Sequence, residues 1–251
     1  MTDLELMLII VLFFMTSVIG VVTGSNSLVT VPVMFQFGID PKVAIATNMF
    51  GLAFMNIGAS IPFMKAGVID YKRLSPLVFI TIIASALGAL LVGIISARII
   101  PVIVSVSMIC VAVFILVKRD SPRDQNNSVS NRARAITFVL TFLLGIYGGL
   151  YSGGYVTVLT AVFAAFFGMN FTEAIAGTKF INVFSSGIAT VIFAAQGLID
   201  YKLGIILAVT MFIAAFFGAH FVTKMDEVWL RRIFLATVFL LAIKTILDFI
   251  L

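Results

Sequence analysis

The chain has 251 residues, of which 62% are hydrophobic and 11% are charged, with a net charge of +5 and a mean hydropathy of +1.21. Because so few charges cannot cover the surface of a water-soluble protein, the composition predicts a protein that crosses a membrane several times. The single cysteine excludes an internal disulfide and a multi-cysteine metal site. With one histidine and one cysteine, the sequence shows no set of catalytic side chains typical of an enzyme, and we expect no cofactor, metal or catalytic residue.

Eight apolar segments approach the length of about 20 residues that a bilayer requires. Two further apolar segments, 27–37 and 155–167, are too short to cross comfortably and are interpreted as broken or re-entrant helices. The predicted fold is therefore an all-α polytopic membrane protein with eight long transmembrane helices and two short ones. The long segments are Leu4–Val22, Val43–Met64, Leu74–Ile95, Pro101–Val117, Ala135–Leu150, Thr172–Ala195, Leu203–Val222 and Trp229–Ile250.

A polar interruption, Gly24-Ser25-Asn26-Ser27, separates the first long segment from the first short one. Irregular backbone is tolerated at membrane depth only inside protein or beside a wet cavity. The start of the short helix would offer free N–H groups and a positive dipole end, which suit an anion. The alternative is that the glycine only allows close packing. The next long helix is expected to begin with Asp40 as its N-cap, and it carries Thr47 and Asn48 near its start.

The polar segment 118–134 contains five basic and two acidic residues, a net charge of +3. Loops rich in lysine and arginine stay on the cytoplasmic side, so the charge is a topology signal and not a sign of nucleic-acid binding. We expect three regions: a first transmembrane repeat over 1–117, a cytoplasmic basic linker over 118–134 and a second repeat over 135–251. The N-terminus is then predicted to face outward.

The second half has a matching interruption, Ser152-Gly153-Gly154, before its short segment. The long segment that follows, with Thr172 as its expected N-cap, contains Thr178, Lys179 and Asn182. On a helix, Lys179 and Asn182 share one face.

A lysine at membrane depth is costly unless it faces protein, water or a counter-ion, so Lys179 marks a candidate anion site. The alternative is that Lys179 extends toward the membrane surface or binds a neighbouring carbonyl.

The two halves repeat each other in one register, since Gly67–Lys72 recurs as Gly197–Lys202. The difference between these position numbers, 200 − 70 = 130, is called the repeat offset. The same offset relates Gly24 to Gly154, Thr30 to Thr160, Gly38 to Gly168 and Gly88 to Gly218. Each half has five segments, an odd number, so the second half would enter the membrane inverted relative to the first. If the short segments enter and return on one side, the repeats would instead be parallel.

In their order and duplication, these motifs resemble the TauE/SafE family of sulfite and organosulfonate permeases over essentially the whole chain. The shared elements are the Gly-containing first break followed by Ser-Leu-Val-x-x-Pro at 27–32, Ala-Thr-Asn at 46–48, a Gly-x-Ile-Asp-Tyr-type loop in both halves and Thr-Lys-x-x-Asn at 178–182. The resemblance implies a secondary transporter, with export as the expected direction, for a small sulfur-containing anion such as sulfite or an organosulfonate.

The substrate is expected near the midplane between the repeats. The partners implied are this anion and the lipid bilayer of a bacterial or archaeal plasma membrane, without nucleic acid, and a homodimer is one alternative for the oligomeric state. An anion channel and a carrier for a small carboxylate are the alternative functions. The candidate substrate-binding residues are Gly24, Ser25, Asn26, Ser27, Thr47, Asn48, Ser152, Gly153, Gly154, Thr178, Lys179 and Asn182.

Overall fold

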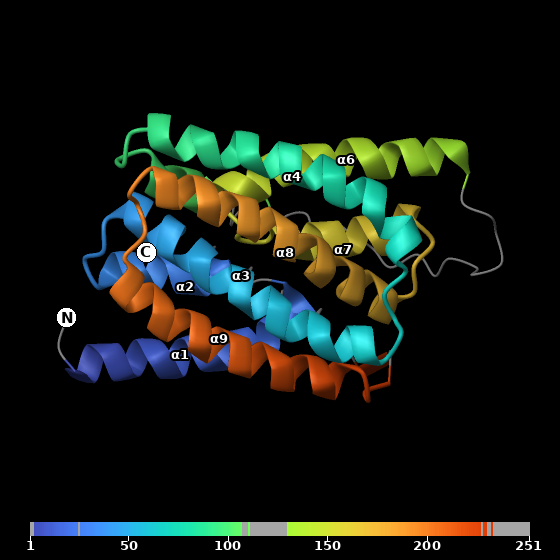
Figure 1. The fold of residues 1–251 in the computed structure, drawn as a ribbon, viewed down its shortest axis with the longest axis horizontal. Helices are drawn as coiled ribbons and strands as arrows, with labels where there is room; N and C mark the ends of the chain where they lie inside the picture. Colours follow the sequence, from blue (N-terminus) through green and yellow to red (C-terminus); the bar gives the residue numbers. More distant parts are fainter. Residues whose placement is uncertain are drawn as a thin grey trace.

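The fold is seen in a computed structural model that describes residues 3–24, 26–106, 110, 130–226, 228, 229 and 232. Its labelled helices lie roughly along one long axis (Figure 1). In the first half these are α1 (Asp3–Thr23), α2 (Ser27–Gln36), α3 (Pro41–Lys65) and α4 (Tyr71–Ile94). In the second half they are α6 (Asn131–Leu150), α7 (Tyr155–Phe166), α8 (Phe171–Ala195) and α9 (Tyr201–Val222).

Six of these helices, α1, α3, α4, α6, α8 and α9, are long and apolar enough to cross a membrane. They confirm an all-helical, multi-pass membrane protein and correspond to six predicted spans. The short helices α2 and α7 have 10 and 12 residues and match the two short apolar segments. Most of the predicted spans Pro101–Val117 and Trp229–Ile250, and most of the linker 118–134, lies outside the described residues, which include only 101–106 and 110 of the first span and 229 and 232 of the second.

Capping side chains fix where the long helices start. The Asp40 carboxylate accepts hydrogen bonds from the backbone N–H groups of Lys42 and Val43, which confirms it as the N-cap of α3. The predicted N-cap at Thr172 is wrong, because Thr172 lies inside the first turn of α8. Asn170 is the N-cap and forms a capping box with Glu173, in which each side chain accepts from the other residue's backbone N–H.

The backbone repeats in the register seen in the sequence. All described residues with positive φ are glycines, and they form pairs related by the repeat offset: Gly24 and Gly154, Gly38 and Gly168, Gly67 and Gly197. Helices α3 and α8 cover 41–65 and 171–195, so the same offset relates both their first and their last residues. Equivalent turns of the two halves therefore share one backbone conformation.

Equivalent helices run in opposite directions along the long axis. In Figure 1, α3 runs from left to right from blue to cyan, whereas α8 runs from right to left from yellow to orange. The same reversal holds for α4 and α9.

The fourth helix of each half packs on the other half. Helix α9 packs against α1 and α3, and α4 packs against α6 and α8. Small residues allow these close approaches: the Cα of Gly88 faces the Ile146 carbonyl of α6, and the Cα of Gly218 faces the Val18 carbonyl of α1. The chain thus forms two interlocked bundles, which we call bundle A (α1, α2, α3 and α9) and bundle B (α4, α6, α7 and α8).

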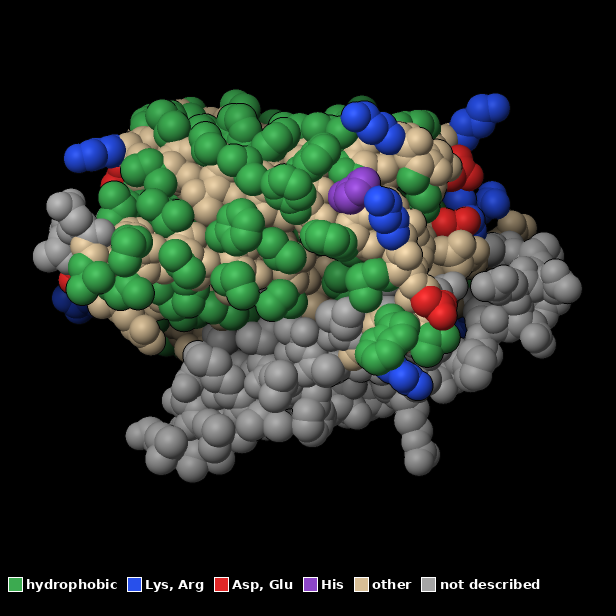
Figure 2. Space-filling model, turned by 90° about the horizontal axis from the view of Figure 1, so that it is seen from below, with side chains coloured by type: hydrophobic (Ala, Val, Ile, Leu, Met, Phe, Trp, Pro, Cys, Tyr) green, Lys and Arg blue, Asp and Glu red, His purple; other side chains and the backbone are tan. Residues whose placement is uncertain are grey.

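Apolar side chains cover most of the described surface in Figure 2, and charged side chains gather toward the ends of the long axis. Large exposed side chains such as Phe79 and Val191, at 68% and 63% exposure, lie on transmembrane helices. This distribution fits a protein surrounded by lipid.

We predict that Gly88→Ala lowers the thermal unfolding temperature, since a Cβ there would meet the Ile146 carbonyl and the Leu150 N–H at the contact of α4 with α6. Overpacking of this kind costs about 1–3 kcal/mol. The matched control is Gly187→Ala on α8, where a Cβ meets nothing within 4 Å. The control is expected to hold or raise stability, because alanine favours helix more than glycine does. Thermal unfolding of both variants in detergent measures this, and a Gly88→Ala variant as stable as the control would contradict the close contact.

Candidate functional site

The two helix interruptions lie against each other, each contacting the opposite half. The Thr157 hydroxyl of α7 donates a hydrogen bond of 2.6 Å to the Thr23 carbonyl at the end of α1. The hydroxyl of Tyr151, the residue before the second interruption, donates at 2.9 Å to the Ser27 carbonyl at the start of α2. The carbonyl groups of Thr23 and Ser27 therefore accept hydrogen bonds from side chains of the second half, which suits irregular backbone at membrane depth.

Gly24 makes this close approach possible. Its φ of +69° is unfavourable for other residues, and a Cβ would lie 2.7 Å from the Thr157 backbone nitrogen and 2.8 Å from Val156 Cγ1. Gly24 therefore allows close packing of the two halves.

Lys179 is buried in α8, with 2% of its surface exposed. Its Nζ donates a hydrogen bond of 2.7 Å to the Gly20 carbonyl, which also accepts from the Gly24 N–H at 2.9 Å. Gly20 is in the last turn of α1, where the helix dipole is negative, so the ammonium is favourably placed. An ammonium has three N–H donors, and the described residues give it this one hydrogen bond.

Two polar side chains near Lys179 have unused hydrogen-bonding capacity. Asn26 is 4% exposed, its Nδ2 makes only a 3.5 Å contact with Met55 Sδ, and its Oδ1 has no partner in the described part of the chain. Asn26 lies next to Gly20, since a Cβ on Gly20 would be 3.1 Å from the Asn26 Cβ. Asn182, one turn after Lys179 and 2% exposed, forms no hydrogen bond through its amide group among the described residues. We call Lys179, Asn182 and Asn26 the central polar site.

Other predicted site residues support the short helices. Asn48 accepts from the Thr30 hydroxyl at 2.8 Å and donates to Ser27 Oγ at 2.9 Å, which binds α2 to α3. In the second half, the hydroxyls of Thr160 and Thr178 lie 3.0 Å apart and join α7 to α8. The repeat offset relates Thr30 to Thr160 and Asn48 to Thr178, so the same support occurs in both halves.

The remaining predicted residues are placed as follows. Thr47 Oγ1 accepts from the Asp200 N–H at 3.0 Å and so joins α3 to the start of α9. Ser152 is buried, and the Gly153 carbonyl accepts from the Tyr147 hydroxyl. Gly154 is the N-cap of α7 in a left-handed conformation. Ser25 lies outside the described residues.

The short helices differ from the long ones at their N-termini. The N-caps of α3, α4, α6, α8 and α9 all accept a backbone N–H through a side chain. Asn26 at α2 and Gly154 at α7 make no such bond. The first N–H groups of α2 and α7 therefore lack the side-chain partner that the other helices have.

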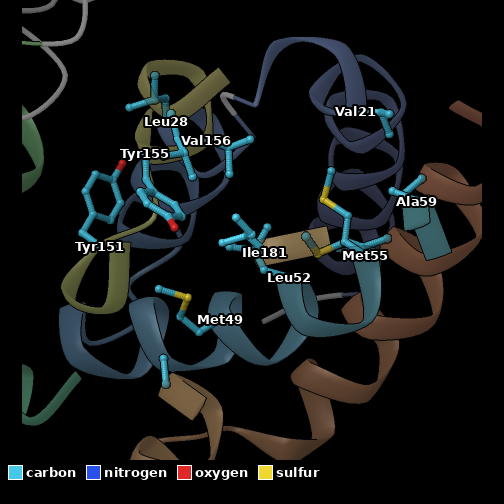
Figure 3. Packing of buried hydrophobic residues seen from close by; sticks show 14 of the residues in the cluster. Val21, Leu28, Met49, Leu52, Met55, Ala59, Tyr151, Tyr155, Val156 and Ile181 are labelled. Carbon is cyan, nitrogen blue, oxygen red and sulfur yellow. The ribbon is translucent and has the colours of Figure 1, made fainter. Parts of the chain in front are cut away.

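The pair Lys179 and Asn182 has no polar counterpart in the first half. At the repeat offset, Met49 and Leu52 stand in α3 where α8 has Lys179 and Asn182. Figure 3 shows Ile181 of α8 among the side chains of Met49, Leu52 and Met55 of α3. Sequence reasoning found Lys179 but missed its partner Gly20, because a backbone carbonyl leaves no side-chain signal in the sequence.

Comparison with known proteins agrees with this architecture. The family model described as sulfite exporter TauE/SafE matches residues 8–245. The chain is 25% identical to "Probable membrane transporter protein ORF9" of Sinorhizobium sp, over 99% of this chain and 96% of that protein.

The chain is also 24% identical to "Probable membrane transporter protein YfcA" of Escherichia coli strain K12, over 95% of this chain and 89% of that protein. A "Probable membrane transporter protein" of Haemophilus influenzae is 23% identical over 98% of this chain and 97% of that protein. No solved structure matches the chain.

We predict that Gly24→Ala destabilises the protein more than Gly38→Ala does. Both glycines have positive φ, +69° and +75°, but a Cβ at Gly38 meets nothing within 4 Å. The left-handed conformation costs about 1–2 kcal/mol at either position, and the clash with Thr157 adds to it only at Gly24. Thermal unfolding of the two variants provides the comparison. Equal losses of stability would mean that the interruptions do not pack together as described.

Proposed function

Because the chain belongs to the sulfite exporter TauE/SafE family, we propose that it is a secondary transporter that exports a small sulfur-containing anion, such as sulfite or an organosulfonate. The family and the curated relatives are membrane transporters and not enzymes. The substrate and the direction of transport are parts of the proposal.

The observation that supports an anionic substrate is the buried ammonium of Lys179, held by one neutral carbonyl. A buried charge without an opposite charge is costly, and an oxyanion is a stronger partner than a carbonyl oxygen. Asn182 on the same helix and Asn26 at the start of α2 add amide N–H donors, and the uncapped start of α2 adds backbone N–H groups. A small oxyanion could therefore replace the Gly20 carbonyl at Lys179 and gain several further donors.

The hydrogen bond between Lys179 and Gly20 also connects the two bundles, because α8 belongs to bundle B and α1 to bundle A. An anion that takes over the ammonium would release this connection. We therefore place the substrate between the bundles and attribute alternating access to their relative movement.

The proposed repeats are inverted, with 1–117 and 135–251 on either side of the cytoplasmic linker. Support comes from the opposite directions of α3 and α8 and from the glycine pairs related by the repeat offset. In the plasma membrane of a bacterium or archaeon, outward movement of one negative charge gains roughly 2.3 kcal/mol per 100 mV of inside-negative potential. Export thus needs no further driving ion on energetic grounds.

Lys179→Met is expected to weaken sulfite binding by roughly 10–100-fold, the equivalent of about 1.5–3 kcal/mol for a hydrogen bond to a charged group. The fold should persist, since the methionine keeps the apolar stem and Met49 fills the equivalent position of α3. Titration calorimetry of the purified protein with sulfite measures this loss.

The matched control is Lys42→Met at the start of α3. Like Lys179, Lys42 donates through Nζ to a backbone carbonyl, that of Gly93, at 3.0 Å. Lys179→Arg is expected to bind partially, since a planar guanidinium does not replace a compact ammonium. Unchanged sulfite affinity in Lys179→Met would mean that Lys179 does not bind the anion.

Flux in proteoliposomes tests the carrier itself. A carrier saturates with sulfite and is accelerated by sulfite on the opposite side, whereas an anion channel shows no such acceleration. Preference for a small carboxylate over sulfite in the same assay would reassign the substrate class.

The topology is tested with single cysteines in a Cys110→Ser background. The cysteine of Thr2→Cys is expected to react with an impermeant reagent from outside, and that of Gln125→Cys only from inside. Labelling of both positions from the same side would exclude the inverted arrangement.

A further inference from the structure

The central polar site contains a hydrogen-bond acceptor that no described residue uses. Asn26 is 4% exposed, and its Oδ1 has no partner in the part of the chain that the structure describes. The contact with Met55 indicates which way the amide faces. A thioether sulfur only accepts, so the atom 3.5 Å from Met55 Sδ is the donor Nδ2. The Asn26 carbonyl oxygen is therefore left as a free, buried acceptor.

The fold does not explain this amide. Asn26 is the N-cap of α2, yet its side chain accepts no backbone N–H there. At the repeat offset Val156 stands in its place, and Val156 is 3% exposed, so the second interruption buries an apolar side chain at the equivalent position. A buried oxygen without a partner costs free energy, and a ligand that donates a hydrogen bond to it recovers that cost.

Asn26 lies where Lys179 reaches the first half of the chain. Lys179 Nζ is 2.7 Å from the Gly20 carbonyl oxygen. A Cβ on Gly20 would lie 3.1 Å from the Asn26 Cβ and 3.3 Å from the Met55 Cε. The ammonium and the asparagine thus meet the same residue of α1. An anion that takes the place of the Gly20 carbonyl at Lys179 has the Asn26 amide beside it.

The surroundings of Lys179 suit a single negative charge. Among the residues that the structure describes, Lys179 is the only charged side chain that is buried. Close by, Figure 3 shows an apolar wall in which Met49, Leu52 and Met55 of α3 lie around Ile181 of α8. A second negative charge on the ligand would face this wall without a counter-ion, which is costly. Export of a singly charged anion also moves the one charge from which the energy gain was calculated.

Sulfite satisfies both conditions in one of its two protonation states. Near neutral pH it exchanges between a dianion and the singly charged hydrogen sulfite, which carries a proton. Hydrogen sulfite offers oxygen acceptors to the N–H groups of Lys179 and Asn182 and offers its proton to Asn26 Oδ1. The dianion has no donor, so it leaves Asn26 Oδ1 unpaired and brings a further lone pair toward it.

We propose that the central polar site selects a singly charged oxyanion that carries its own hydrogen-bond donor, which for sulfite is hydrogen sulfite, and that Asn26 Oδ1 accepts this hydrogen bond. The inference rests on the proposed function, because it requires that an oxyanion binds Lys179. Lys179 then supplies the charge, and Asn26 determines which protonation state of the anion is bound.

The test is titration calorimetry of the purified full chain with sulfite and with methanesulfonate, in a slightly acidic and in a slightly alkaline buffer. Methanesulfonate is a singly charged oxyanion without a donor, and its charge is the same in both buffers. Its affinity therefore records any titration of Lys179 or of other protein groups.

In the acidic buffer, sulfite is expected to bind about 2–10-fold more tightly than methanesulfonate, the effect of one hydrogen bond. In the alkaline buffer, where hydrogen sulfite is depleted, total sulfite is expected to lose this advantage. A ratio of the two affinities that is the same in both buffers, or that favours sulfite in the alkaline one, would overturn the proposal.

A variant tests the role of Asn26. Asn26→Leu removes the amide at nearly constant volume, and the side chain that it replaces caps no helix. In the acidic buffer this variant is expected to bind sulfite and methanesulfonate equally. The control Thr141→Val removes another buried oxygen without a described partner, on α6, and should keep the preference for sulfite. A preference that persists in Asn26→Leu would show that Asn26 is not the acceptor. The wild-type comparison decides the matter if Asn26→Leu does not fold.

The outcomes separate this inference from the proposed function. If both anions bind the wild type equally and lose affinity in Lys179→Met, the anion site stands, the specificity is wrong and water is the partner of Asn26 Oδ1. If neither anion binds the wild type, the proposed substrate class fails and the specificity fails with it.

Discussion

Irregular backbone inside a membrane needs partners from the protein, and hydrogen bonds to the backbone carbonyl groups around the first interruption organise the centre of the molecule. Three carbonyls around the first interruption, those of Gly20, Thr23 and Ser27, accept hydrogen bonds from Lys179, Thr157 and Tyr151. All three donors come from the second half. The interruption in one repeat is therefore completed by the other repeat, and the candidate substrate site lies where this completion occurs.

The duplicated backbone carries two different sets of side chains. Turns, caps and the links from short to long helices recur at the repeat offset, whereas Lys179 and Asn182 of α8 correspond to Met49 and Leu52 in α3. A scaffold built from two equivalent repeats can change between two related conformations. Because only one of the two equivalent positions carries a charge, an anion would have different surroundings in the two conformations. In the proposed transporter, symmetry would serve the movement of the two bundles, and its local loss would serve recognition of the anion.

Much of this arrangement can be predicted from the sequence, because local signals dictate it. Apolar length marks the six described spans, Asp40 before Pro41 marks the start of α3, and the repeated glycines mark the turns. The start of α8 was misplaced because Asn170 and Thr172 both suit an N-cap, and only the capping box with Glu173 decides between them. Contacts across the halves could not be predicted. Neither the Gly20 carbonyl that receives Lys179 nor the packing of α4 and α9 on the opposite half leaves a mark in the local pattern.

The exchange of α4 and α9 between halves has a consequence for biosynthesis. Helix α4 leaves the ribosome before α6 and α8, the helices on which it packs, have been made. The glycine face around Gly88 must therefore wait in lipid, or beside an insertion factor, until translation has passed Ile146, whose carbonyl it contacts. Bundle B can close only after α8 has been made and bundle A only after α9, so the packing of both bundles comes late in synthesis.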